Sequence, residues 1–268
     1  LATGQQAGEP LTGHAGSVLA VGTVVVDGRS LAVTGGADGT VRVWDLAVGR
    51  QVGEPLTGHD DMVCAVGTVV VDGRSFAVTG SWDETVLVWD LATGQQAGEP
   101  LTGHAGSVLA VGTVVVDGRS LAISGGADGT VRVWDLAVSR QVGEPLTGHD
   151  DTVVAVGAVV VDGRPLAVTG SWDETVLVWD LATGQQAGQP LTGHIGPVLA
   201  VGTAVMSGRP LGITSSHDET VRVWDLATRE QVGPELVFPE PVHAVAVAPD
   251  GRLVVGFGEE VAVLAPLT

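Results

Sequence analysis

Histidine, hydroxyl and carboxylate residues recur along this chain at spacings that suggest catalysis. His104, Ser124 and Asp128 have the residue types of a hydrolytic triad, in which histidine activates a hydroxyl nucleophile and a carboxylate orients the histidine. The same types recur five times, with threonine in place of serine in four copies. A catalytic site is seldom repeated in this way, and no Gly-x-Ser-x-Gly elbow accompanies the serine. The sequence therefore favours a structural role, and we expect no catalytic residues.

Metal binding is disfavoured for a similar reason. Each repeat supplies one histidine of this kind, and the additional His217 and His243 stand alone in the sequence. A protein metal site needs three or four ligands that converge. We therefore expect no metal and no cofactor.

The elements that carry these residues form a repeat of 45 residues. Gly-His pairs place histidine at His14, His59, His104, His149 and His194, and Trp-Asp pairs place tryptophan at Trp44, Trp89, Trp134, Trp179 and Trp224. A second, longer period of 90 residues is also present, because residues 1–45 and 91–135 differ at two positions and residues 46–90 and 136–180 differ at six. A sixth unit has lost both dipeptides but keeps the sequence Ala-Pro-Asp-Gly-Arg at 248–252. Fixed periods of this length are typical of repeat architectures.

Each unit carries the signals of four short strands. In the first, the apolar run 18–26 is followed by the turn sequence Asp-Gly-Arg-Ser, and 31–34 and 41–44 are further strand-like runs. A weaker fourth strand is expected over 51–56. Asp-Gly between β-rich runs is a strong hairpin signal, and no segment shows helical periodicity. Four antiparallel strands in each unit of this size predict the blades of a β-propeller.

The Gly-His, Asp-Gly-Thr and Trp-Asp motifs at these spacings resemble the WD40-repeat β-propeller family over essentially the whole chain, and in particular its highly repetitive bacterial members. The resemblance implies an all-β ring of six four-stranded blades and, in each of the first five, a hydrogen-bonded structural tetrad. The tetrads would be His14, Thr34, Asp38, Trp44; His59, Thr79, Asp83, Trp89; His104, Ser124, Asp128, Trp134; His149, Thr169, Asp173, Trp179; and His194, Thr214, Asp218, Trp224. His14 to Asp27 is one residue longer than the family spacing, which predicts a bulge in the innermost strand.

We expect a single propeller domain over 1–268. Its blades would lie at about 13–57, 58–102, 103–147, 148–192, 193–236 and 237–268, and residues 1–12 would supply the outer strand that completes the last blade. Such closure removes an unpaired sheet edge. The alternative is that the sequence is a fragment of a longer protein with a seven- or eight-bladed ring. A monomer is expected, although near-identical blades would also permit domain-swapped multimers.

Charge narrows the choice of partner. Twelve Lys and Arg residues, all of them arginine, stand against 31 Asp and Glu, for a formal net charge of −19. Such a surface repels nucleic acid and favours a basic protein partner. No stretch is apolar enough over roughly 20 residues to insert in a membrane. The lone Cys64 lies in an apolar run, is expected to be a small buried residue, and is compatible with a reducing, cytoplasmic location.

Two tryptophans point to where a partner would bind. Trp82 and Trp172 lie in the sequence Ser-Trp-Asp-Glu-Thr of the second and fourth units, where the first and third units have alanine. The Gly-His loops of the same units continue with aspartate pairs. The candidate partner-binding residues are therefore Asp60, Asp61, Trp82, Asp150, Asp151, Trp172 and His217. Carboxylates beside an indole suit a basic segment, since both attract cations.

The leading interpretation is a non-catalytic interaction scaffold or sensing module of a longer bacterial protein, which binds a partner on the rim that carries the Gly-His loops. A solvated acidic face without a partner is the simpler alternative for these residues. A glycan- or small-ligand-binding propeller with repeated pockets also stays open. An enzyme that uses the central channel is a third possibility, but the innermost strand is almost entirely apolar and would give that channel little chemistry.

Overall fold

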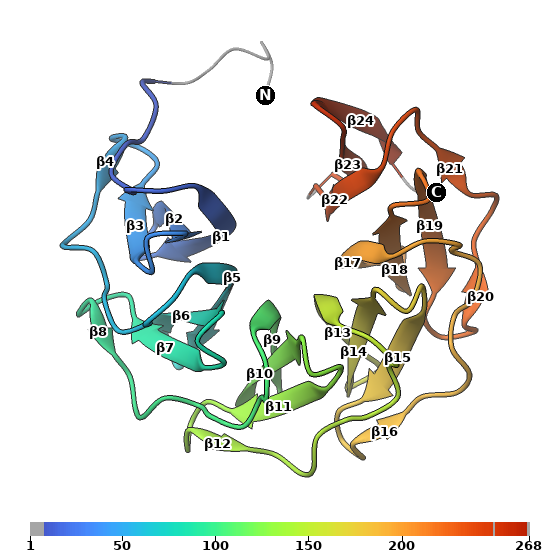
Figure 1. The fold of residues 1–268 in the computed structure, drawn as a ribbon, viewed down its shortest axis with the longest axis horizontal. Helices are drawn as coiled ribbons and strands as arrows, with labels where there is room; N and C mark the ends of the chain where they lie inside the picture. The colour runs from blue at the N-terminus through green and yellow to red at the C-terminus, as the bar shows by residue number, and fades with distance from the viewer. Residues whose placement is uncertain (1–7, 249, 267–268) are drawn as a thin grey trace.

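The computed structural model describes residues 8–248 and 250–266. All regular structure in these residues is β-strand, arranged as the six blades of a β-propeller around a central axis (Figure 1). The described part of the chain contains no helix that could cross a membrane. The sequence prediction of an all-β, six-bladed fold is confirmed.

The blades are consecutive antiparallel sheets. The first contains β1 (Val18–Val26), β2 (Arg29–Gly36), β3 (Val41–Asp45) and β4 (Arg50–Gln51), hydrogen-bonded in that order from the axis outward. The second contains β5 (Val63–Val71), β6 (Arg74–Ser81), β7 (Val86–Asp90) and β8 (Gln95–Gln96). The third contains β9 (Val108–Val116), β10 (Arg119–Gly126), β11 (Val131–Asp135) and β12 (Arg140–Gln141).

The later blades follow the same plan with additions and losses. The fourth contains β13 (Val153–Val161), β14 (Arg164–Ser171), β15 (Val176–Asp180) and β16 (Gln185–Gln186). The fifth contains β17 (Val198–Met206), β18 (Arg209–Ser216), β19 (Thr220–Asp225) and β20 (Glu230–Gln231), and β21 (Leu236–Val237) also pairs with β19. The sixth contains β22 (Val242–Val247), β23 (Arg252–Phe257) and β24 (Glu260–Pro266).

Local backbone geometry follows the turn residues. Asp27 and Gly28 both have positive φ, at 49° and 78°, so the β1–β2 hairpin has a two-residue turn whose twist matches that of the strands. Between Val18 and Ala20 the β1–β2 register shifts by one residue, and the same shift occurs at the start of the innermost strand in every blade. The predicted bulge is therefore confirmed.

The fourth strand is shorter than predicted. The first blade was expected to have an outer strand over 51–56, but β4 covers only Arg50 and Gln51, and Leu56 then makes an isolated bridge to Val41. Gly53, with φ 71°, and Pro55 lie between them and interrupt the ladder, because proline has no N–H and a left-handed residue does not continue a strand.

Adjacent blades make very close contacts near the axis. A Cβ built on Gly80 would lie 2.6 Å from Val108 Cγ1, and equivalent glycines in the first, third and fourth blades meet the next valine at 2.4–2.6 Å. Polar links join neighbouring innermost strands, since Thr68 Oγ1 donates to the Thr23 carbonyl and Thr113 Oγ1 to the Thr68 carbonyl, both at 2.8 Å. Apolar clusters fill the space farther out, as where Trp134 of the third blade packs with valines of the second. This packing fixes the angle between neighbouring blades.

The predicted closing strand is not seen among the described residues. Residues 1–7 lie outside them, and residues 8–12 form no strand. Gly8, Glu9 and Leu11 lie beside the turn at Leu46–Gly49 of the first blade. This part of the segment therefore lies with the first blade and not beside β24 (Figure 1). The sixth sheet accordingly has three strands in the described residues, and an open sector separates β1 from β24.

Candidate functional site

The histidine, threonine and tryptophan of each predicted tetrad meet in the structure. In the second blade, Trp89 Nε1 donates to Thr79 Oγ1 at 2.9 Å, and the same hydroxyl lies 2.8 Å from His59 Nε2. His59 Nδ1 lies 2.8 Å from an Asp83 carboxylate oxygen. A neutral histidine fits this chain, with Nδ1–H donating to the carboxylate and Nε2 accepting from the hydroxyl. The other four tetrads repeat the arrangement, with serine replacing threonine at Ser124.

A fifth member of the network was missed from the sequence. Thr85 Oγ1 donates to Asp83 at 2.7 Å, and the backbone N–H groups of Thr85 and Asp60 donate to the same carboxylate. The corresponding threonines of the other blades are Thr40, Thr130, Thr175 and Thr220. Their constant position two residues after the aspartate was the available signal. The tetrad aspartate thus fastens the Gly-His loop to the β2–β3-type turn of its own blade.

Burial and hydrogen bonding shift the pKa values of the tetrad side chains. Burial lowers the pKa of His59 below 6.5 despite the nearby Asp83, and the pKa values of His104, His149 and His194 are lowered for the same reason. Burial opposes ionisation of Asp83 too, but hydrogen bonds from Thr85 and His59 outweigh it and lower the pKa of that carboxyl. These four histidines are therefore neutral, and Asp83 is charged, at pH 7.

Acid is expected to destabilise the propeller through these histidines. Histidines of the unfolded chain bind protons as the pH falls through 6.5, while the four folded ones stay neutral until a lower pH, so the unfolded state binds more protons. The contribution of these histidines to the free energy of unfolding is fully present above pH 6.5 and is lost below it. The loss for each histidine is about 1.4 kcal/mol for each unit by which its pKa in the folded state lies below that in the unfolded state. Urea unfolding from pH 8 to pH 5 measures this. His59→Gln should reduce the loss, and a midpoint unchanged between pH 6.5 and pH 5 would contradict the neutral assignment.

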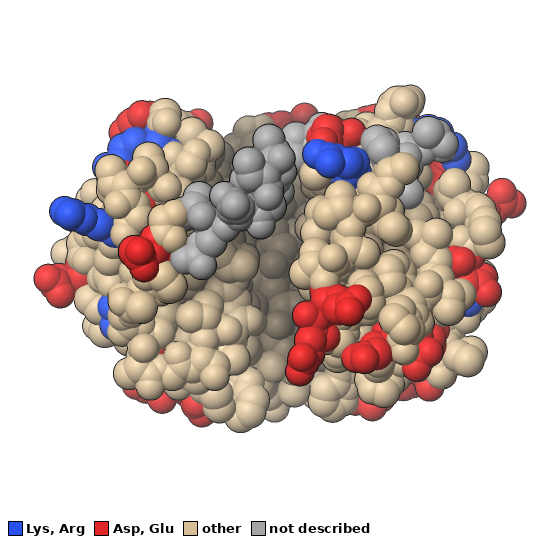
Figure 2. Space-filling model, turned by 90° about the horizontal axis from the view of Figure 1, so that it is seen from above, with Lys and Arg blue, Asp and Glu red and all other residues tan. Residues whose placement is uncertain are grey.

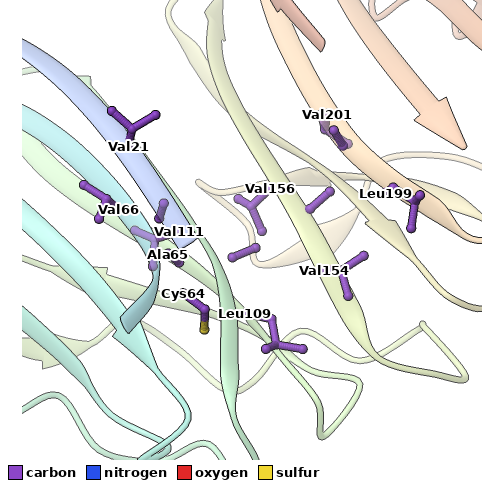
Figure 3. Close-up of a pocket in the computed structure, with 14 residues that line it drawn as sticks. Val21, Cys64, Ala65, Val66, Leu109, Val111, Val154, Val156, Leu199 and Val201 are labelled. Atoms are coloured by element: carbon purple, nitrogen blue, oxygen red, sulfur yellow. The ribbon is translucent and has the colours of Figure 1, made fainter. Parts of the chain in front are cut away.

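The central channel offers little chemistry in the described residues. Its wall is formed by the innermost strands, and the labelled side chains of Figure 3 are aliphatic except for Cys64. Cys64 is half-buried, its Sγ donates to the Val108 carbonyl at 3.1 Å, and burial raises the pKa of the thiol to about 11. A thiol with so high a pKa is a poor nucleophile at neutral pH. No group of three or more metal-ligating side chains is found in the described residues.

The rim with the Gly-His loops carries the exposed candidate residues. Trp82 and Trp172 expose 47% and 50% of their surface, although most tryptophans of the Trp-Asp pairs are almost fully buried. The backbone N–H of Trp82 donates to the Met62 carbonyl at 3.0 Å, and Ser81 Oγ donates to the Asp61 carbonyl at 3.1 Å. These bonds place the aspartate pair beside the tryptophan turn. The fourth blade repeats them through Trp172, Thr152 and Asp151.

We define the even-blade patches by these residues and one addition each. They are Asp60, Asp61, Trp82 and Glu84 in the second blade, and Asp150, Asp151, Trp172 and Glu174 in the fourth, all of them exposed. Sequence reasoning missed the glutamates. Glu84 and Glu174 have φ of 69°, where the odd blades have Gly39 and Gly129 at similar angles. A glutamate kept in left-handed backbone stores strain of about 1 kcal/mol. Glu219 of the fifth blade, with φ 66°, has the same conformation, so this strain is not confined to the even blades.

Arginine is absent from these patches and present in the odd blades. Arg42, Arg132 and Arg222 each donate to a glutamine, at 2.6 Å, and lie against the glycine of their own Gly-His loop. The even blades have Leu87 and Leu177 at this position. Positive charge thus alternates with negative charge around the rim, and the even-blade patches have no compensating cation of this kind.

His217 lies apart from both patches. It is exposed on the same rim, in the turn of the fifth blade that corresponds to the tryptophan turns. The Gly-His loop beside it carries Ile195, 82% exposed, in place of an aspartate pair. The fifth blade therefore presents an exposed isoleucine and Glu219 but lacks the indole and the aspartate pair.

On the opposite rim, charged side chains form structural ion pairs. Arg119 Nη2 lies 2.8 Å from Asp135, and Arg209 Nη2 lies 2.8 Å from Asp225, so the arginine of each β1–β2-type turn pairs with the aspartate of the Trp-Asp motif. Arg29, Arg74 and Arg164 pair in the same way with Asp45, Asp90 and Asp180. The sequence showed these arginines only as turn residues. These pairs hold each β1–β2-type turn to the third strand of its own blade.

Blades with this strand order and a repeated histidine–hydroxyl–tryptophan network define a propeller of the WD-repeat class. A comparison with protein-family models finds the WD40 family, described as WD domain, G-beta repeat, at residues 5–45, 49–90, 95–135, 140–180 and 185–225. These matches cover most of the chain, which therefore belongs to the WD40 family. A search of curated proteins found no match.

Proposed function

We propose that this propeller is an interaction scaffold that binds basic segments of a partner protein on its even-blade patches. WD40 propellers commonly act as interaction scaffolds and are generally not catalytic, which agrees with the aliphatic channel. The observation that carries the proposal is the half-exposure of Trp82 and Trp172. The indoles are not required to build a blade, since Ala37 and Ala127 hold the same position in the odd blades.

The chemistry of a patch suits an arginine or lysine side chain. Each patch combines three exposed carboxylates with one half-exposed indole, whose face attracts a cation with about 0.5–2 kcal/mol. A guanidinium adds paired hydrogen bonds to a carboxylate. With a net charge of −19, the whole chain would also speed the approach of a basic partner.

Two patches, separated by the third blade, favour a partner with two basic segments. The blades that carry them differ at only six of 45 positions, so the two patches should have similar intrinsic affinity. A tether between two bound segments makes the second binding event intramolecular and raises overall affinity without new contacts.

Binding of a fluorescently labelled hexa-arginine peptide tests the proposal. Trp82→Ala and Trp172→Ala should each weaken binding at their own patch by about 0.5–2 kcal/mol, because the cation–π contact is lost. Fluorescence anisotropy at several salt concentrations measures both the affinity and its dependence on ionic strength. Raising the salt should weaken binding, since exposed charges are screened.

Ile195→Ala is the matched control. It removes an exposed apolar side chain from the same rim, in a blade without an aspartate pair, and should leave peptide binding unchanged. Peptide affinity that is insensitive both to salt and to the tryptophan replacements would refute the proposal. Salt-insensitive binding of oligosaccharides that is lost in the tryptophan variants would instead favour a glycan, which can also stack on an exposed indole.

A further inference from the structure

The third blade carries a half-buried arginine that has no acidic partner. Arg132 lies on β11, its Nη1 donates to Gln141 Oε1 at 2.6 Å, and its Nε is buried without a hydrogen-bond partner. Among the described residues it forms no ion pair, whereas Arg119 of the same blade pairs with Asp135. A charge that is partly removed from water is costly unless an opposite charge compensates it. Arg132 therefore remains available to an acidic group.

The guanidinium of Arg132 lies against the Gly-His loop of its own blade. A Cβ built on Gly103 would lie 2.6 Å from Arg132 Nη1 and 3.1 Å from its Cζ, and Gly103 is exposed. Because residue 103 has no side chain, none from this position covers the guanidinium. Burial chiefly lowers the pKa of His104 in the same loop, and the charge of Arg132 lowers it further. Arg132 therefore belongs to the rim that carries the Gly-His loops.

The fifth blade shows what an arginine at this position accepts. Arg222 holds the equivalent place and makes the same glutamine bond at 2.6 Å, and its Nη1 lies 3.9 Å from a carboxylate oxygen of Glu235. The residue that corresponds to Glu235 in the third blade is Pro145, since each precedes the leucine that pairs with the third strand. The chain thus supplies an acid to Arg222 and none to Arg132, so a carboxylate from another molecule suits Arg132.

Arg132 lies between the two even-blade patches in the order of the ring. The second and fourth blades flank the third (Figure 1), and both have leucine where the third has arginine, at Leu87 and Leu177. Acidic residues are the commoner charge on the face drawn in Figure 2, in keeping with the net charge of −19, so an arginine at the rim is a local exception. From the second to the fourth blade the rim is therefore negative, positive and negative. Arg42 and Arg222 lie outside that span.

We propose that the partner carries an acidic residue between its two basic segments, and that this carboxylate pairs with Arg132. The inference rests on the proposed function, because basic segments on both patches oblige the stretch between them to pass the third blade. A basic residue in that stretch is repelled by Arg132, and a neutral one leaves the guanidinium unpaired. A carboxylate accepts paired hydrogen bonds from it. The rim thus selects a basic, acidic and basic order in the partner rather than positive charge alone.

The test compares two labelled peptides, each with two tri-arginine segments joined by a Gly-Ser linker that has either glutamate or glutamine at its centre. A series of linkers first selects the length that binds most tightly. Glutamate lowers the positive charge of the peptide, so attraction to the acidic chain alone would weaken its binding. Pairing with Arg132 should reverse this order and make the glutamate peptide bind about fivefold more tightly, the upper end for an ion pair at a surface. Fluorescence anisotropy measures both affinities.

Two variants assign the preference to one side chain. Arg132→Leu introduces the residue of the even blades, where Leu87 and Leu177 are buried, and should abolish the preference for glutamate. Arg42→Leu makes the same change outside the span between the patches and should keep it. A glutamate peptide that binds the original chain no more tightly than the glutamine peptide, or a preference that survives Arg132→Leu, would overturn the inference alone. Binding of neither peptide would refute the even-blade patches and this inference with them.

Discussion

Replacing Gly125 with valine is expected to destabilise the propeller by about 3 kcal/mol. A Cβ at this position would lie 2.5 Å from Val153 Cγ1 and 3.1 Å from the Val153 carbonyl oxygen. The carbonyl belongs to the innermost strand of the next blade and cannot move without breaking its sheet, so the added side chain must separate two blades. Overpacking of a tight core costs about 1–3 kcal/mol, and here backbone is displaced as well. Urea unfolding followed by far-UV circular dichroism measures the loss.

Gly256→Val is the matched control for this prediction. Gly256 has the same place in the sixth blade, but a Cβ there would meet only Ala244 Cβ at 3.5 Å, an ordinary contact. The valine should change stability by less than about 1 kcal/mol, since strands tolerate β-branched residues. Equal losses at Gly125 and Gly256 would contradict the described packing of the blades.

Replacing Thr79 with valine is expected to destabilise the propeller by about 2–4 kcal/mol. Valine has nearly the shape of threonine but removes the hydroxyl that accepts from Trp89 Nε1 and lies beside His59 Nε2. Thr79 is fully buried, so neither ring nitrogen would regain a partner from water. An unsatisfied buried polar group costs about 1–3 kcal/mol, and this change leaves two.

Thr79→Ser separates the hydroxyl from the rest of the side chain. The third blade already uses Ser124, whose Oγ makes both bonds at 2.8 Å, so the serine variant should lose less than about 1 kcal/mol. The difference in urea midpoint between the two variants reports the hydroxyl alone. A valine variant as stable as the serine variant would mean that the tetrad contributes nothing to stability.

The repeat made most of the fold predictable. Two dipeptides at a period of 45 residues located five blades, and the spacing from His14 to Asp27 predicted the bulge. The predicted outer strand was too long, because Gly53 and Pro55 end the ladder after Gln51. The predicted closing strand falls mainly on residues 1–7, outside the described residues, so ring closure stays a prediction.

The candidate site was predictable where residue type alone decided exposure. Trp82 and Trp172 stood out because alanine occupies their position in alternate blades. Glu84 and Glu174 were missed because their left-handed φ is visible only in the structure. The alternation of Arg42 with Leu87 was visible in the sequence, but its effect on the rim depends on which end of the strand faces the Gly-His loop.

Isothermal titration of the 268-residue chain with hexa-arginine at low salt would show directly whether the acidic rim of the second and fourth blades binds cationic peptides. We predict two equivalent sites per chain, with Trp82→Ala or Trp172→Ala weakening one of them by about 0.5–2 kcal/mol and the double variant weakening both. Heat and stoichiometry that are the same in the double variant as in the original chain would show that these patches do not bind the peptide.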